Sequence, residues 1–182
     1  RRQRQMCIRD RLYITFKITD NKLTVTHKVI NTNAEEMYFS IGAHPAFNCN
    51  LGDTLTFEYD ETLYSERIDR DSVITGDKDL ILQNSNIIEI TEHLFDKDAL
   101  IFPNVKSNYV ILNEKKAGKH IRFTFGDSPF LAIWAKPAAP FVCIEPWYGV
   151  NDSYEKATDF SKKRGIQKLS SGKKFEFSWS AE

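Results

Sequence analysis

Short segments rich in β-branched and aromatic residues recur along the chain, and this pattern restricts the fold more than any other feature. Residues 12–18 and 23–30 have such sequences and are separated by the turn-forming sequence Thr-Asp-Asn-Lys. They predict a β-hairpin. The further predicted strands are residues 36–40, 54–59, 87–91, 99–102, 109–112, 120–125, 130–135, 141–144 and 175–179.

Helical periodicity is absent, and only residues 91–96 and 153–160 have sequences suited to a helical turn or two. Many short strands at a spacing of roughly 8–12 residues are typical of an antiparallel β-sandwich or barrel. Aromatic residues make up 13% of the 182 residues, which suits a β-rich core or a sugar-binding cleft. No linker or repeat divides the sequence, so we expect an all-β fold in one domain or part of one.

The first ten residues differ from the rest of the chain. They lack periodicity, and they lack the apolar stretch of about 7–15 residues that a signal peptide requires. Residues 5–10 resemble a translation of the transposon end that is used to tag sequencing libraries. We therefore expect residues 1–10 to be a non-native leader. Residues 11–182 are then the C-terminal portion of a single domain that is incomplete at its N-terminus and has a bare sheet edge.

Charge and hydropathy exclude two classes of partner. Residues 1–10 carry a net charge of +3, so that residues 11–182 carry −3 in a chain with no net charge, and their basic residues are scattered. Nucleic-acid binding needs a clustered basic face, so we expect no nucleic-acid partner. No apolar segment approaches the ~20 residues that cross a bilayer, so we expect no membrane partner and a cytoplasmic location.

The chain has three cysteines, Cys7, Cys49 and Cys143. Cys7 lies in the suspected leader, and the other two lie beside the motifs described next. Because no secretion signal is visible, two free buried thiols are favoured over a disulfide.

Two motifs each place one ionisable side chain directly before a proline. The first is Ile-Gly-Ala-His-Pro-Ala-Phe-Asn at residues 41–48, and the second is Cys-Ile-Glu-Pro-Trp-Tyr-Gly at residues 143–149. His44 and Glu145 are therefore a candidate acid and base, a pair that typically accelerates proton transfer by about 10²–10⁴-fold.

Both residues also have structural interpretations. His44 could be a hydrogen-bonded polar residue at a strand end, although Pro45 fixes extended geometry there and Gly42 leaves room for a ligand. Glu145 follows an apolar segment, where a carboxylate is costly unless it is paired or used. Its alternative role is an ion pair with a lysine or arginine. Partial burial would raise its pKa and make it a better base near neutral pH.

The remaining polar candidates are less specific. Asp98 precedes the apolar segment 99–102, where it either caps a turn or accepts a hydrogen bond from a sugar hydroxyl. His93, His27 and His120 favour structural or solvated positions. The histidine spacings match no metal-binding motif, and no glycine-rich phosphate loop or nucleophile elbow is present. We therefore expect no metal and no nucleophilic catalysis.

With these motifs in place, the chain resembles the aldose 1-epimerase (galactose mutarotase) family, most closely its LacX-like branch. The resemblance extends from about Leu12 to Ser180 and is carried by residues 37–48, 94–102 and 141–149. It implies an antiparallel β-supersandwich that interconverts the α and β anomers of a free aldose, without cofactor or metal. In that chemistry a glutamate deprotonates the C1 hydroxyl and a histidine protonates the ring oxygen.

The resemblance assigns these roles to Glu145 as base and His44 as acid. We expect their functional atoms to lie roughly 4–8 Å apart, each within reach of its own sugar oxygen. Asp98 corresponds to a ligand of a substrate hydroxyl, and the resemblance places Phe47, Asn48 and Trp147 at the sugar.

Members of this family are longer, and their N-terminal part contributes an arginine and another histidine to the cleft. The isolated chain is therefore expected to be weakly active or inactive. A non-catalytic carbohydrate-binding β-sandwich is the main alternative. A glycoside hydrolase is a weaker one, because it would need two catalytic carboxylates.

Overall fold

The computed structural model describes residues 10–116, 118–137, 139–155 and 159–182. Residues 1–9 of the suspected leader, which include Cys7, lie outside these ranges. The described strands are β1 (Asp10–Thr19), β2 (Lys22–Asn31), β3 (Met37–Phe39), β4 (Ile41–Gly42), β5 (Ala46–Asn48), β6 (Thr54–Ile68), β7 (Ile74–Glu89), β8 (Leu100–Pro103), β9 (Tyr109–Asn113), β10 (His120–Thr124), β11 (Phe130–Trp134), β12 (Phe141–Tyr148), β13 (Gln167–Leu169) and β14 (Lys174–Ala181).

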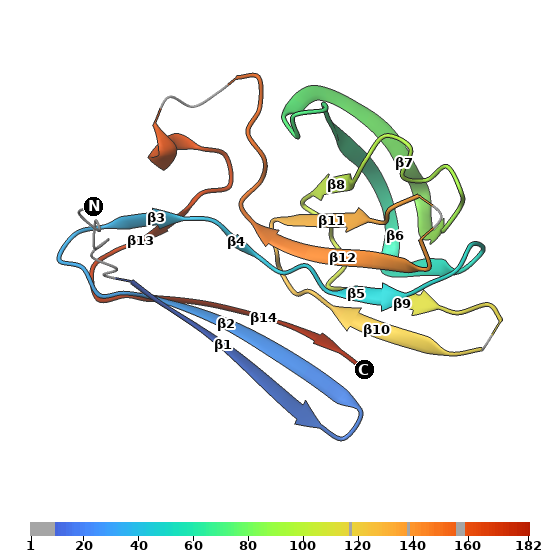
Figure 1. Ribbon diagram of the computed structural model, residues 1–182, viewed down its shortest axis with the longest axis horizontal. Coiled ribbons are helices and arrows are strands. Elements are labelled where there is room, and N and C mark those ends of the chain that lie inside the picture. Colours follow the sequence, from blue (N-terminus) through green and yellow to red (C-terminus); the bar gives the residue numbers. More distant parts are fainter. Residues whose placement is uncertain (1–9, 117, 138, 156–158) are drawn as a thin grey trace, which may run out of the picture.

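The described strands confirm the all-β prediction, and every named strand pair is antiparallel. One curved 12-stranded sheet has the order β1-β2-β14-β10-β9-β6-β8-β11-β12-β4, with β5 beside β12 and β7 beside β6 (Figure 1). Strands β13 and β3 form a separate pair. In the described part of the chain, helical structure is limited to the single-turn 3₁₀ helix η1 (Phe160–Lys162).

The predicted hairpin is confirmed as β1 and β2, which pair along their whole length from Asp10↔Asn31 to Thr19↔Lys22. Strand β1 lies at one end of the sheet order, and all ten of its residues are exposed. No helix among the described residues is both long and apolar enough to span a bilayer.

The sheet has two faces that matter for the site. On β8, β11 and β12, side chains at alternate positions enter the main core with those of β6, β7, β9 and β10. The intervening positions face a smaller apolar cluster formed by Ile74, Ile101, Phe130, Ala132 and Val150. Strand β11 is almost continuously apolar because both of its faces are covered.

His27 occupies the structural position that its alternation in β2 predicts. It is buried, its ring stacks on Phe177 with centroids 4.6 Å apart, and its Nδ1 has no hydrogen-bond partner in the described structure. Burial lowers the pKa of His27 below its usual 6.5. The folded protein therefore favours the neutral ring.

We expect this burial to make folding sensitive to mild acid. Because the pKa is lowered in the folded state, the unfolded chain binds the proton first, and stability falls as pH drops below 6.5. The contribution is at most about 1.4 kcal/mol per pH unit. Urea unfolding between about pH 5 and 8 should show a flatter dependence for His27→Phe than for the unmodified chain. His120→Phe, at an exposed site, should leave the dependence unchanged, and equal slopes for all three proteins would contradict this role.

Candidate active site

Glu145 is positioned by the alternation of β12. Val142 and Ile144 face the main core, so Cys143, Glu145 and Trp147 face the opposite side. Glu145 lies opposite Ala132 of the neighbouring strand β11. The glutamate is only 2% exposed. The buried middle of β12 therefore holds a carboxylate that needs a partner.

His44 supplies that partner. The segment between β4 and β5 is fixed on β12 by two backbone hydrogen bonds, from Ala43 N to Pro146 O and from Ile144 N to Pro45 O. His44 Nδ1 lies 2.6 Å from Glu145 Oε2. The expected separation of 4–8 Å is wrong, because the two groups bond directly to each other. The pair is not closed, since the His44 side chain is 61% exposed.

Trp147 completes the contacts of the carboxylate. Its Nε1 donates to Glu145 Oε2 at 3.1 Å, the same oxygen that His44 contacts. Gly42 allows this position of the indole, because a Cβ there would lie 2.8 Å from Trp147 Cδ1. Burial raises the pKa of Glu145, and the opposing effects of His44 and Trp147 are smaller. The direction is the one expected for a base that works near neutral pH.

Two predicted sugar contacts from the first motif lie elsewhere. Phe47 does not face the site, because β5 alternates and its ring packs edge-on against Phe123 in the main core, with centroids 5.4 Å apart. Asn48 is on the same face as Glu145 but lies opposite Phe141, four residues earlier on β12. That is about 13 Å along the strand from Glu145.

Asp98 also lies apart from the pair. It precedes β8, which lies two strands from β12 in the sheet. Ile101 of β8 pairs with Ala132 of β11, and Ala132 pairs with Glu145. The Asp98 carboxylate accepts a hydrogen bond from Ala99 N at 2.7 Å, as a turn cap would. In the described ranges, no contact joins Asp98 to His44 or Glu145.

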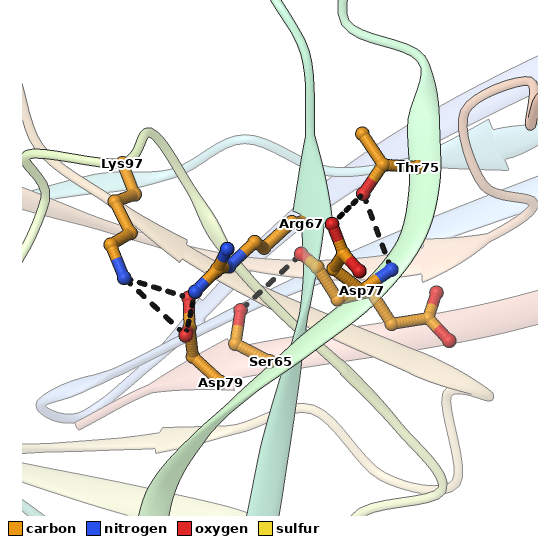
Figure 2. Close-up of polar contacts among 7 residues, drawn as sticks. Ser65, Arg67, Thr75, Asp77, Asp79 and Lys97 are labelled. Atoms are coloured by element: carbon orange, nitrogen blue, oxygen red, sulfur yellow. Dashed lines mark hydrogen bonds and ion pairs between the residues drawn. The ribbon is translucent and has the colours of Figure 1, made fainter.

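Asp98 lines a separate polar groove of about 380 Å³. There Arg67 and Lys97 both reach toward Asp79 (Figure 2). The hydrogen bond from Arg67 lowers the pKa of Asp79 to about 2. His93 borders the same groove as an exposed side chain that pairs with Asp96. Arg67 and Lys97 of this groove are thus both engaged by Asp79.

Trp134 and Cys143 are near the pair and were not predicted as site residues. Trp134 lies opposite Cys143 in the sheet, and its ring centroid is 6.3 Å from that of His44. The prediction that Cys49 and Cys143 are free and buried is confirmed. Burial, followed by the charge of Glu145, raises the pKa of Cys143 to about 11. Alternation within 130–135 could have placed Trp134 on this face, but only the strand register places it beside His44.

Comparisons with known proteins agree with the architecture. A model of the aldose 1-epimerase family matches residues 11–176. The plasmid-encoded protein LacX of Lactococcus lactis subsp. lactis is 31% identical over 169 residues, which cover 87% of this chain and 56% of LacX. The chain therefore spans little more than half the length of this relative.

Two solved structures have the same fold. A galactose mutarotase-related enzyme from Lactobacillus acidophilus superimposes with a TM-score of 0.85 at 27% identity, over 94% of this chain and 60% of that one. A galactose mutarotase-like protein from Lactobacillus casei ATCC 334 gives 0.85 at 29% identity, over 95% and 63% of the two chains. By sequence and by fold, this chain belongs to the aldose 1-epimerase family, in its LacX-like branch.

Proposed function

We propose that this chain carries the acid–base pair of a sugar mutarotase, with Glu145 as base and His44 as acid acting on a free aldose. One observation supports the proposal above others: a buried carboxylate of raised pKa is in direct contact with an exposed imidazole. Membership of the aldose 1-epimerase family supports a free aldose as the substrate. The free, buried state of Cys49 and Cys143 favours a reducing compartment, and we propose the cytoplasm.

The atoms that remain available define the mechanism. The contacts of His44 and Glu145 within the described residues involve Nδ1 and Oε2, which leaves imidazole Nε2 and carboxylate Oε1 for a sugar. Glu145 would take the proton of the C1 hydroxyl while protonated His44 donates to the ring oxygen. The C1–ring oxygen bond breaks, and the open-chain aldehyde rotates. Closure on the other face returns both protons, so that no nucleophile or cofactor is needed.

The direct contact also orients the pair. After ring opening, Glu145 holds a proton and His44 has lost the one on Nε2, and ring closure reverses both transfers. The 2.6 Å contact between Nδ1 and Oε2 holds the imidazole and the carboxyl group in place during both steps. Trp147 keeps Oε2 oriented throughout, because its indole N–H donates to that oxygen in either state.

A second candidate function is carbohydrate binding without catalysis. The same short contact supports it, because a histidine and a glutamate that satisfy each other could be a structural pair beside an aromatic surface. This alternative predicts sugar binding with no acceleration of anomer exchange. The rate of anomer exchange in the presence of the protein therefore distinguishes the two functions.

We expect the chain to accelerate anomer exchange weakly, with a bell-shaped pH profile. The acidic limb should lie above the ordinary glutamate value of 4.5, because burial raises the pKa of Glu145 and the base must be ionised. The alkaline limb follows because a general acid must carry a proton. Two-dimensional NMR exchange spectroscopy on glucose and galactose, at high protein concentration, would measure the rate directly. A profile that is flat from about pH 5 to 9 would count against the pair.

A further inference from the structure

Three potential metal ligands of different chemistry meet at the acid–base pair. The ligand atoms of His44, Cys143 and Glu145 all lie within 4.8 Å of one another. Spacing between histidines gives no sign of this cluster, because two ligands come from alternate positions of β12 and the third comes from a segment about a hundred residues earlier. The strand pairing of β12 with β4 and β5 brings them together.

The cluster is close to the dimensions of a three-ligand zinc site. Zinc bonds of about 2.0–2.3 Å in tetrahedral geometry place ligand atoms about 3.4–3.6 Å apart. The separation between His44 Nδ1 and Glu145 Oε2 would have to open from 2.6 Å by less than about 1 Å. Because His44 is an exposed side chain, it can make this movement by rotation, while Cys143 and Glu145 remain in the strand.

Charge and access favour a thiophilic divalent cation over a harder one. A thiolate, a carboxylate and a neutral imidazole balance a charge of +2, and metal coordination deprotonates a thiol outright. Calcium and magnesium prefer sets of oxygen ligands, which this cluster does not provide. The exposed side of His44 leaves a path to the cluster and a fourth position for water.

We propose that His44, Cys143 and Glu145 form a binding site for a thiophilic divalent cation such as Zn²⁺ or Cd²⁺. The bound cation occupies His44 Nδ1 and the Glu145 carboxylate. If the pair acts as proposed above, the cation blocks proton transfer and is an inhibitor, and the metal-free protein is the active form. Binding itself does not depend on the proposed function.

Titration of the reduced, metal-free chain with Cd²⁺ tests the site. Thiolate coordination gives an ultraviolet charge-transfer absorption, which should saturate at one equivalent. Cys143→Ala should abolish the absorption that saturates at one equivalent of Cd²⁺. His44→Gln should weaken the affinity for Cd²⁺ at least tenfold. Cys49→Ala and Cys7→Ala are matched controls that remove the other two thiols. Both should bind as the unmodified chain does.

Two results would overturn the proposal: no saturable absorption in the unmodified chain, or absorption that survives Cys143→Ala. Circular dichroism of each variant establishes that loss of binding is not loss of folding. Since the readout is metal–thiolate absorption, a chain that binds Cd²⁺ but never exchanges anomers refutes only the proposed function. A chain that exchanges anomers equally well with and without saturating Cd²⁺ refutes only the inhibition.

Discussion

Replacing Glu145 by glutamine is expected to lower the protein-dependent rate of anomer exchange by at least 10²-fold, to the spontaneous rate. Glutamine keeps the size of the side chain and can still accept from Trp147 Nε1, but it cannot take a proton from the C1 hydroxyl. Sugar affinity should change little. NMR exchange spectroscopy gives the rate, and chemical-shift titration of the same sample gives the affinity.

The matched control is Glu176→Gln, the same chemical change at an exposed position of β14. It should leave both rate and affinity unchanged. If Glu145→Gln binds sugar and exchanges anomers as fast as the unmodified chain, Glu145 is not the base. If the unmodified chain binds sugar and never exceeds the spontaneous rate, the carbohydrate-binding alternative is the correct one.

Local sequence was sufficient for most of the sheet. The hairpin of β1 and β2 was predicted because two segments rich in β-branched and aromatic residues flank the turn-forming sequence Thr-Asp-Asn-Lys. Strand β7 was recognised only at its C-terminal end. Its first part contains Gly76 and Asn84 in left-handed conformations, and these residues normally indicate turns. Long-range pairing with β6 holds this segment extended despite its composition.

The candidate site residues divide in a similar way. His44 and Glu145 were predicted because a proline follows each of them and fixes the backbone there. Phe47 was misplaced because the motif was interpreted as one surface, whereas successive residues of β5 point to opposite faces. The proximity of Trp134 and Cys143 to His44 depends on strand register, which a single sequence does not contain.

A second buried carboxylate lies on the same face as Glu145, three strands away. Glu66 of β6 is opposite Ile101, and the row continues through Ala132 to Glu145. Glu66 is 4% exposed and accepts two hydrogen bonds from Arg164, at 2.8 and 3.0 Å. The guanidinium also lies over the ring of Phe130, which is opposite Trp147 in the sheet. Arg164 therefore joins the segment around η1 to the face that carries the site.

Arg164→Met is expected to be among the most destabilising single changes in the chain. Among the described residues, it leaves the buried Glu66 charge with Lys78, at 3.9 Å, as its remaining ion-pair partner. Breaking a buried ion pair by removing one partner costs about 3–5 kcal/mol, and the half-exposed Arg164 argues for the lower end. Urea denaturation should measure this loss. Adding Glu66→Gln should recover much of it, because the uncompensated charge is then gone.

Arg122→Met provides the comparison for an exposed arginine. Its Nε lies 4.0 Å from Glu182 at the surface, and an exposed pair contributes at most about 1 kcal/mol. Hydrogen exchange should separate the two variants further, with faster exchange near Phe130 and Trp147 only in Arg164→Met. Equal losses of stability in both variants, or no recovery by Glu66→Gln, would mean that the buried pair does not anchor this segment. In that case the position of the indole that orients Glu145 does not depend on Arg164.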